Sequence, residues 1–471
     1  MDVLLLLIHG AIAIAVVRAL LLGGRSMLVI AAFLLPLSGL TYSAGVSWNW
    51  TRLLGPILAF GMLIHGVLFR TIRLPGLQYI GSFILYGAGL SFYFWQLYPE
   101  ILPLVERARL IGWGRGQTEL RYAVQYLVMV FNWFFLFGGM AFTRSADDRD
   151  AAMSAFVSGC ILSVVVGLYQ AIAQGNGLPW ITPTEELAGF LGSRRVITTY
   201  EVAGGLKLTR LFGLGGEPKH TAAFVTLALA FLLASSLYDR EFKVSRTKII
   251  VLLLGLMLTL STSGVLAFIF LCIMMLRSRD LFVTRNAFGA LGAVLLIGVS
   301  ILAISVVFGE RTTTNLVEDR FSSRLSGGFD TIRRYEGKDA AALELLWDEP
   351  ERVFFGHGSG GIDFHLIDRV PVVEREKQSM ITPTYLLVRV LSEYGLVGLM
   401  LLLLMGWSWT QRLKSERSAA LRVYFVALLL TALVQPTFVY PSVLFLLGTA
   451  LGALVSESGT SSPSDSLPKV A

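Results

Sequence analysis

The sequence predicts an all-α polytopic membrane protein with about 12–13 transmembrane helices, one of them broken in the middle, and one long, partly helical loop outside the membrane. Two observations support this fold class. Of the 471 residues, 55% are hydrophobic and only 15% are charged, and the mean hydropathy is +0.68. Apolar runs of about 18 or more residues, long enough to cross a bilayer as a helix, recur along the chain.

The apolar runs divide the chain into four parts. Residues 1–308 form an N-terminal transmembrane bundle, 309–381 an external loop, 382–456 the C-terminal transmembrane helices and 457–471 a Ser-rich, disordered tail. The predicted spans are 3–22, 27–43, 53–69, 78–98, 121–142, 151–172, 220–238, 249–276, 286–308, 382–408, 419–435 and 438–456. No cleavage-site pattern follows the first run, so we interpret it as a membrane helix and not as a signal peptide.

The eighth run, residues 249–276, is too long for one span. As a single helix it would measure about 42 Å, against a hydrocarbon core of about 30 Å. Its middle holds Ser261, Thr262, Ser263 and Gly264, which compete with the helix for backbone hydrogen bonds. Both flanks are basic, and basic flanks favour the cytoplasm. The run is therefore predicted to enter the membrane and return as two short helices. A single tilted helix is the alternative, and it leaves one basic flank on the far side.

The same positive-inside rule orients the loops. Cytoplasmic loops are predicted at 143–150, 239–248, 277–285 and 409–418, and external segments at 99–120, 174–219 and 309–381. Arg107, Arg109, Arg115 and Arg121 then lie outside, against the rule. Either the number of preceding spans is wrong by one or these arginines bind a ligand, and both interpretations stay open.

Charge and cysteine usage exclude several classes of function. The net charge of +7 comes mostly from short basic loops, so it indicates orientation in a membrane and not nucleic-acid binding. Cys160 and Cys272 lie inside apolar runs without metal-ligand spacing, which argues against a disulfide framework and against a zinc site. His9 and His65 also lie in apolar runs and are interpreted as interior groups with hydrogen-bond partners.

The long loop contains recognisable local structure. An amphipathic helix that packs on another element is predicted around Ala340, Ala341, Leu343, Leu345, Leu346 and Trp347. The pair Glu349-Pro350 ends it, because the residue before proline is pushed out of the helical region. A glycine-rich turn, Gly-His-Gly-Ser-Gly-Gly, follows at 356–361. It lacks the lysine and the following helix of a nucleotide loop, so by itself it indicates only a tight turn.

A second polar stretch, residues 207–221, reads KLTRLFGLGGEPKHT and lies directly before an apolar run. Its glycines and its proline prevent a helix from starting earlier, so the charged residues are held at the membrane edge on irregular backbone. One interpretation is an interface anchor for the next helix. The other is a phosphate-binding site, to which an arginine offers a planar pair of donors.

Basic, acidic and imidazole groups gather on the predicted external side. The cations are Arg194, Arg195, Arg210, Lys219, Arg324, Arg333 and Arg334, and beside them are Glu217, His220, His357 and His365. Such groups suit a diphosphate that leaves and a sugar hydroxyl that attacks: the cations stabilise the departing charge, and a carboxylate or imidazole takes the proton. The predicted external segments contain no acidic Asp-x-Asp cluster, so neither a metal nor a cofactor is predicted.

Three ordered blocks resemble the O-antigen polymerase and ligase superfamily of bacterial glycan-assembly membrane proteins. The first is Arg210 to Gly213 followed by Glu217-Pro218 at a helix start. The second runs from Arg333 to Phe364 and contains an Arg-led helix, a proline and a Gly-x-Gly turn. The third is Tyr385-Leu386 followed by 391–399, which is similar to the family's tyrosine, its Glu-x-Gly and its Gly-Leu helix. The blocks span roughly residues 205–410.

The resemblance implies roles for individual residues. It implies that Arg210 binds the donor diphosphate. From the charges on the predicted external side we add Lys219, Arg333 and Arg334 to this role, and Glu217, His220 and His357 as candidates for acid–base catalysis. The long loop would cap the site, with Arg194, Arg195, Arg324, Gly356, Gly358, Tyr385 and Glu393 in supporting positions. Two departures weaken a ligase assignment: Thr382-Pro383-Thr384 stands where many members have a His-Asn pair, and Ser261-Thr262-Ser263 stands where Ser-Arg is frequent.

Family members join glycans carried on undecaprenyl diphosphate at the periplasmic face of the bacterial cytoplasmic membrane. The resemblance therefore implies a metal-independent glycosyltransferase that polymerises a surface polysaccharide or exopolysaccharide. Its partners would be an undecaprenyl-diphosphate-linked oligosaccharide, the lipid bilayer and a chain-length regulator protein. A ligase that moves finished glycan to an acceptor is the alternative within the class. A transporter or flippase of a lipid-linked sugar is the alternative from another class, and its usual internal repeat is not seen.

Overall fold

We describe the fold from a computed structural model of the chain. The structure describes residues 2–43, 47–67, 76–97, 99–100, 102–103, 106, 120–175, 178, 200–202, 206–208, 211–216, 218–238, 245–259, 261, 264–265, 267–269, 271–272, 337–366, 369, 383, 385–413, 424, 428 and 440–460.

The described part of the chain is predominantly helical, as predicted, and its apolar helices are compatible with a membrane protein. Four helices are long and apolar enough to cross a bilayer: α6 (Leu120–Phe142), α7 (Ala146–Gly175), α9 (Pro218–Tyr238) and α20 (Leu386–Leu413). Shorter apolar helices lie within α1 (Asp2–Leu22), α2 (Gly24–Leu34), α3 (Trp50–Ile64) and α22 (Tyr440–Thr460). The number of 12–13 spans includes segments outside the described residues and stays a prediction.

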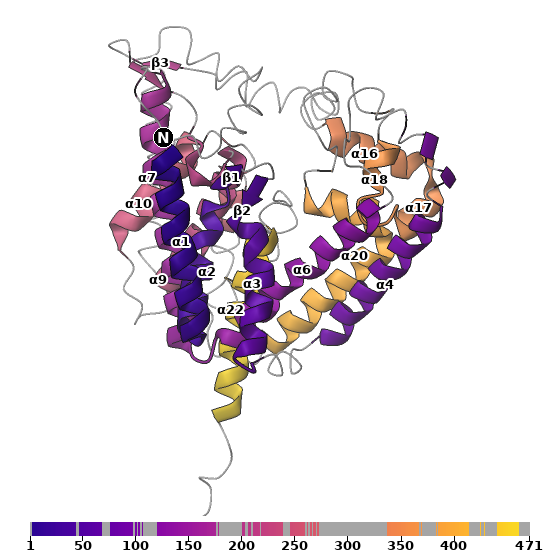
Figure 1. Cartoon of the computed structure of the whole chain (residues 1–471), viewed down its shortest axis with the longest axis horizontal. Coiled ribbons are helices and arrows are strands. Elements are labelled where there is room, and N and C mark those ends of the chain that lie inside the picture. The colour runs from indigo at the N-terminus through magenta and orange to yellow at the C-terminus, as the bar shows by residue number, and fades with distance from the viewer. Residues whose placement is uncertain are drawn as a thin grey trace, which may run out of the picture.

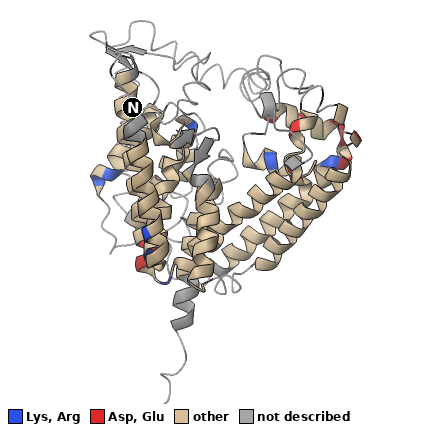
Figure 2. Cartoon of the chain, in the orientation of Figure 1, with Lys and Arg blue, Asp and Glu red and all other residues tan. Residues whose placement is uncertain are grey.

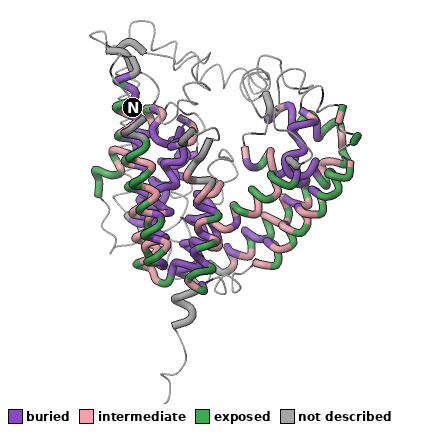
Figure 3. The backbone as a smooth tube through the Cα atoms, viewed as in Figure 1, coloured by how far each residue is buried: buried purple, intermediate pink, exposed green. Residues whose placement is uncertain are grey.

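One group of helices packs around α9 (Figure 1). In the apolar window Pro218–Ser235 of α9, 89% of the residues are buried, and the helix contacts α7 and α10 (Arg246–Leu258). A helix that is apolar on all sides is expected to be enclosed by other helices or by lipid. The outer helices instead expose large apolar side chains, such as Ile14 at 72% and Leu21 at 78% in α1 (Figure 3). Their exposure fits contact with lipid tails better than contact with water.

A second group consists of α4 (Leu77–Gln96), α6 and α20, which lie side by side in Figure 1. Their lengths are almost free of charge among the residues coloured in Figure 2, and charged residues gather where the long loop meets α20. At that end three short helices cover the group: α16 (Gly337–Asp348), α17 (Pro350–Phe355) and α18 (Ile362–His365). We call residues 337–366 the cap.

The predicted helix of the long loop is confirmed as α16, and the cap packs on the transmembrane helices as expected. Ala341, Ala342 and Leu345 are buried, whereas two predicted packing residues, Leu343 and Trp347, face outward at 45% and 87% exposure. Pro350 does more than end this helix. It is the first residue of α17, a position where the missing N–H costs nothing and the fixed φ favours the helix.

Several helix ends differ from the apolar runs. The run 27–43 is helical only to Leu34. It continues as a 3₁₀ turn (Leu35–Leu37) and a short hairpin of β1 (Thr41–Ser43) and β2 (Ser47–Asn49). Pro36 prevents the α-helical hydrogen-bond pattern from continuing there. At the other end of the chain α22 extends to Thr460, beyond the predicted end of the last span at 456.

The eighth run begins as α10 and leaves the helical conformation near its serine-rich middle. α10 ends at Leu258, and the Thr259 hydroxyl donates to the Leu256 carbonyl at 2.6 Å. Ser261 is not helical, although its carbonyl accepts the N–H of Val265 at 3.0 Å, where helical residues resume. Thr262 and Ser263 lie outside the described residues. The side of the membrane to which the run returns stays a prediction.

Candidate functional site

The first resemblance block lies on α7, between two short strands and the start of α9. The strands β3 (Tyr200–Val202) and β4 (Leu206–Leu208) pair antiparallel. The 3₁₀ turn η3 (Gly213–Gly215) follows, and the N–H of Leu214 donates to the Ser163 hydroxyl of α7 at 2.8 Å. Gly213 and Gly216 have φ of 63° and 89°, so the turn needs residues without a Cβ. The block thereby directs the start of α9, where Lys219 and His220 are half-buried.

The second block forms the cap, and its glycine-rich turn lies directly on the membrane helices. Gly356, Gly358 and Gly360 all have φ above 70°. A Cβ at Gly356 would lie 2.5 Å from the backbone of Glu393 in α20, and one at Gly358 would lie 2.7 Å from the ring of Phe94 in α4. Each of these two positions therefore requires glycine for two reasons: the positive φ and the close approach of the neighbouring helix.

The third block supplies the surface on which the turn lies. Gly395 interrupts α20 with φ of 64° and ψ of −167°, a conformation that is essentially restricted to glycine. A break in a helix leaves the preceding carbonyl groups without their intrahelical donors. The cap supplies two replacements: His357 N–H donates to the Ser392 carbonyl and Gly358 N–H to the Glu393 carbonyl, each at 2.9 Å. The N–H groups of the turn therefore pair with the carbonyls that the kink leaves free.

Two tyrosines complete the junction between the cap and the kink. The hydroxyl of Tyr86 in α4 donates towards the carbonyls of Phe355 and Tyr394, at 3.1 Å from each. The hydroxyls of Tyr394 and Ser359 form a buried hydrogen bond of 2.6 Å. These polar contacts join segments that lie far apart in the sequence and fix the cap on the ends of α4 and α20.

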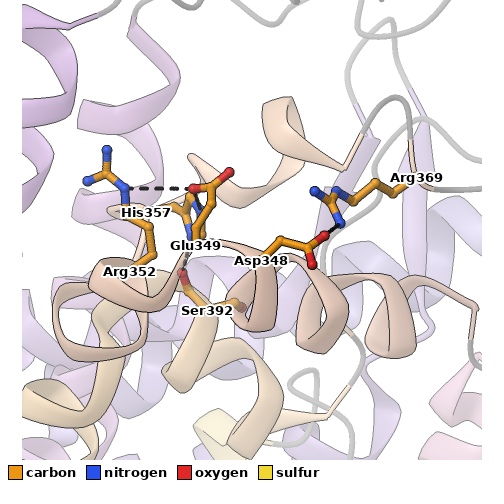
Figure 4. Close-up of polar contacts among 6 residues, drawn as sticks. All are labelled: Asp348, Glu349, Arg352, His357, Arg369 and Ser392. Atoms are coloured by element: carbon orange, nitrogen blue, oxygen red, sulfur yellow. Dashed lines mark hydrogen bonds and ion pairs between the residues drawn. The ribbon is translucent and has the colours of Figure 1, made fainter.

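His357 is the central side chain of the cap and is 0% exposed. Its Nδ1 lies 3.0 Å from the carbonyl oxygen of Ser392, and because a carbonyl only accepts, Nδ1 carries the hydrogen. Its Nε2 lies 3.2 Å from Oε2 of Glu349, as Figure 4 shows. The ring of His365 is 4.7 Å away, centroid to centroid. Glu349, His357 and His365 thus form one compact group.

The surroundings shift two pKa values in this group. The hydrogen bond from His357 lowers the pKa of the Glu349 carboxyl, and the charges of the neighbouring histidines and Arg352 act in the same direction. Burial lowers the pKa of His365 to about 4, with a further contribution from the neighbouring His357. At neutral pH Glu349 is therefore a carboxylate and His365 is a neutral imidazole with a lone pair.

Three arginines in this part of the chain carry carboxylate partners. Arg369 contacts Asp348 at 2.5 Å, and Nε of Arg352 lies 3.8 Å from Glu349 (Figure 4). In α20, Nε of Arg389 donates to Oε1 of Glu393 at 3.0 Å. The Arg389–Glu393 pair lies inside an apolar span, with side-chain exposures of 26% and 2%. Ionisable groups in such spans are costly, so each needs its partner.

The predicted site residues fall into three sets. Gly356, His357, Gly358 and Glu393 meet at the junction of the cap with α20, and the N–H of Tyr385 donates to the buried Asp339 of the cap at 3.1 Å. Lys219 and His220 do not join them, because the first block is held by α7 and α10, where Leu211 N–H donates to the Leu258 carbonyl at 3.0 Å. The remaining residues lie outside the described part: Arg194, Arg195, Arg210, Glu217, Arg324, Arg333 and Arg334.

Sequence reasoning gave no site role to four residues that the structure brings to the cap and its junction with α20: Glu349, Arg352, Arg389 and Tyr394. His365 was named among the external imidazoles, but its contacts with His357 and Glu349 were not predicted. Arg389 and Glu393 carried a usable signal, because two opposite charges four positions apart in an apolar helix indicate an internal ion pair. His365 carried none, since its contacts depend on the turn before it. No family model and no curated protein sequence matches this chain.

Proposed function

We propose that the chain is a glycan polymerase of the bacterial cytoplasmic membrane. It would transfer a saccharide from undecaprenyl diphosphate to the terminal hydroxyl of another lipid-linked repeat unit. The hydroxyl oxygen forms a bond to the anomeric carbon, the bond from that carbon to the diphosphate breaks, and the hydroxyl proton passes to a base. A single displacement of this kind inverts the anomeric centre.

One observation carries the proposal. The second and third resemblance blocks meet in space, with His357 on Ser392 across 35 positions of sequence, at the end of the apolar helices where Arg352, Arg369 and Arg389 gather. An arginine has five N–H donors. Arg369 and Arg389 each use one in a hydrogen bond to a carboxylate, whereas Nε of Arg352 makes no hydrogen bond among the described residues. Polar chemistry at the end of an apolar bundle is what a lipid-linked substrate requires.

Exposed aromatic side chains support a position at the lipid headgroups. On the cap, Trp347, Phe354 and Phe355 are 87%, 55% and 54% exposed, and Tyr93 and Trp95 near the end of α4 are 50% and 51% exposed. Tryptophan and tyrosine are enriched at membrane–water interfaces, where the ring lies in the lipid and the polar atom contacts water. We infer that the cap rests at the periplasmic interface, where the diphosphate of a polyprenyl carrier lies.

The chemical roles follow from the resemblance and the geometry. Arg210, with Lys219, Arg333 and Arg334, would bind the donor diphosphate, so that arginines and not a metal stabilise the departing charge. Proton transfer falls to Glu217 or His220. His357 is buried with both ring nitrogens in contact, so we assign it a positioning role and no longer a role as base.

The proposal also includes the topology. The eighth run would cross as two short helices with its polar break near the periplasmic face, which the end of α10 at Leu258 and the non-helical Ser261 support. The basic start of α10, with Arg246 and Lys248 exposed, would then face the cytoplasm.

The test compares Arg210→Ala and Arg210→Lys in cells by the length distribution of the polysaccharide. Both variants should shift the product towards single repeats, and lysine should not restore length because it keeps the charge but loses the planar pair of donors. Arg246→Ala, a basic residue on the predicted cytoplasmic side, serves as the control and should leave long chains. Unchanged long chains in both Arg210 variants at normal protein level would refute the assignment. Cells without the protein that still make long chains on the lipid carrier would identify a ligase.

A further inference from the structure

We propose that Glu349, His357 and His365 form a binding site for a divalent transition-metal ion, with Zn²⁺ as the best fit. This site goes beyond the proposed function and does not depend on it. It also revises the expectation of a metal-free protein, which rested on the lack of an acidic cluster. The three residues come from the start of α17, the glycine-rich turn and the end of α18.

The three donors already lie close together. Each residue offers one ligand atom, and the three atoms lie within 4.8 Å of one another. Zinc ligands at about 2.0–2.2 Å from the ion lie roughly 3.3 Å apart. Small side-chain rotations therefore bring all three into one coordination sphere without movement of the backbone.

His357 is oriented as a metal ligand would be. Its Nδ1–H donates to the Ser392 carbonyl at 3.0 Å, so in the neutral ring the lone pair is on Nε2. In that form Nε2 and Oε2 of Glu349, 3.2 Å apart, are two neighbouring acceptor atoms that one cation can bridge. Metal-binding histidines in proteins nearly always donate their other N–H to a carbonyl or carboxylate in this way.

His365 offers the third ligand atom. Its Nε2 is buried and finds no hydrogen-bond partner among the described residues. A buried polar atom without a partner costs free energy, and such atoms indicate an unseen ligand. The His365 ring lies beside that of His357, 4.7 Å between centroids, so both imidazoles border the same small volume.

The donor set selects the metal. Two imidazoles and one carboxylate suit Zn²⁺ and its d-block neighbours, whereas Mg²⁺ and Ca²⁺ prefer oxygen ligands. The Glu349 side chain is 32% exposed while His357 is 0% exposed, so the ion would enter past Glu349 and a water would complete its coordination there. Arg352, 3.8 Å from Glu349, opposes the binding of a cation and weakens the affinity.

An imidazolium form of His357, which donates to both Ser392 and Glu349, would account for the His357–Glu349 contact without a metal. The following experiment separates the imidazolium from the metal site. The full-length protein is purified in detergent with a tag free of histidine, stripped with a chelator, incubated with Zn²⁺ and desalted. Metal content is then measured by mass spectrometry. We expect about one zinc ion per chain, and much less retention of Mg²⁺ or Ca²⁺ under the same treatment.

The variants test the ligands one at a time. Glu349→Gln and His365→Ala should weaken zinc binding by roughly 100-fold or more. Even loss of a group that only hydrogen-bonds to a metal ligand lowers metal affinity by about 10–100-fold. His365→Cys should retain zinc, because a thiolate is also a zinc ligand. Asp348→Asn, which changes the neighbouring carboxylate that pairs with Arg369, is the matched control and should bind as the wild type does.

A second readout does not depend on metal counting. Zinc should raise the Tm of the wild type and of His365→Cys but not of His365→Ala, and Co²⁺ should give the visible absorption of a site with imidazole ligands. Wild-type protein that retains no zinc overturns the proposal. Equal zinc retention in Glu349→Gln, His365→Ala and wild type also overturns it, because the ion then lies elsewhere. Neither result bears on Arg210, so the polymerase proposal stands or falls separately.

Discussion

His357 makes two hydrogen bonds to a single atom, the carbonyl oxygen of Ser392, one from its backbone nitrogen at 2.9 Å and one from Nδ1 at 3.0 Å. The carbonyl is available because Gly395 interrupts α20 three residues later and removes its intrahelical donor. The cap and the kinked helix therefore form one unit. Loss of the kink should loosen the cap, and loss of the cap should leave buried carbonyls without donors.

Gly395→Ala should destabilise the protein by roughly 1–3 kcal/mol, the cost of forcing an ordinary residue into a glycine-only conformation. The new Cβ would also collide with the carbonyl oxygen of Phe354 in the cap. The measurement is thermal unfolding of the purified protein in detergent. Gly89→Ala in α4 is the control: its Cβ meets nothing within 4 Å, and alanine favours a helix interior. Equal Tm values for the two variants would contradict the role of the kink.

Tyr86→Phe should free the cap locally without unfolding the membrane helices. The change removes the hydroxyl that lies between the Phe355 and Tyr394 carbonyls, a loss of about 1 kcal/mol. We expect faster proteolysis within residues 337–366 and a Tm close to that of the wild type. Tyr126→Phe, whose hydroxyl donates to the Ile84 carbonyl within the membrane helices, should leave cap proteolysis unchanged.

Arg389→Ala should cost roughly 3–5 kcal/mol, because it leaves the Glu393 carboxylate, 2% exposed, without a partner inside an apolar span. Arg369→Ala breaks an ion pair of similar length at the surface of the cap, where both side chains are at least 32% exposed. Its cost should stay below about 1 kcal/mol. Chemical denaturation or Tm distinguishes the two, and Arg389→Ala with Glu393→Ala should recover part of the loss.

Several helices could be predicted from the sequence, because the length and composition of an apolar run depend only on neighbouring residues. The runs at 78–98, 121–142 and 220–238 appear as α4, α6 and α9 with ends shifted by few residues. Glu349-Pro350 likewise marks the boundary between α16 and α17. In each case the position of the helix or of its end is determined by residues that are close in sequence, through apolar composition or through the geometry of proline.

The site was less accessible because its contacts join distant segments. Gly395 within an apolar run reads as a tolerated helix glycine, and only the cap beneath its break explains it. Likewise, Glu349, His357 and His365 lie eight positions apart, but no continuous helix joins them, and the glycine-rich turn brings them together. Lys219 and His220 were expected beside His357 because both stretches were assigned to one membrane face. A shared face does not bring residues into contact.

The side of the membrane on which the cap lies can be read by cysteine labelling. Trp347→Cys in a background without Cys160 and Cys272 should react with a membrane-impermeant maleimide in intact spheroplasts, since residue 347 is 87% exposed and predicted to be periplasmic. Ser245→Cys, exposed at the start of α10, should react only after permeabilisation. The reverse pattern would place the cap in the cytoplasm and remove the polyprenyl diphosphate carrier from its reach.

The most direct test of the polymerase proposal is reconstitution of the reaction with purified protein and undecaprenyl-diphosphate-linked repeat units. The account predicts a ladder of products that grows by one repeat at a time, one lipid diphosphate released for each bond formed, and loss of both in Arg210→Ala. Repeat units that stay single, or that cross a vesicle membrane intact without bond formation, would contradict it.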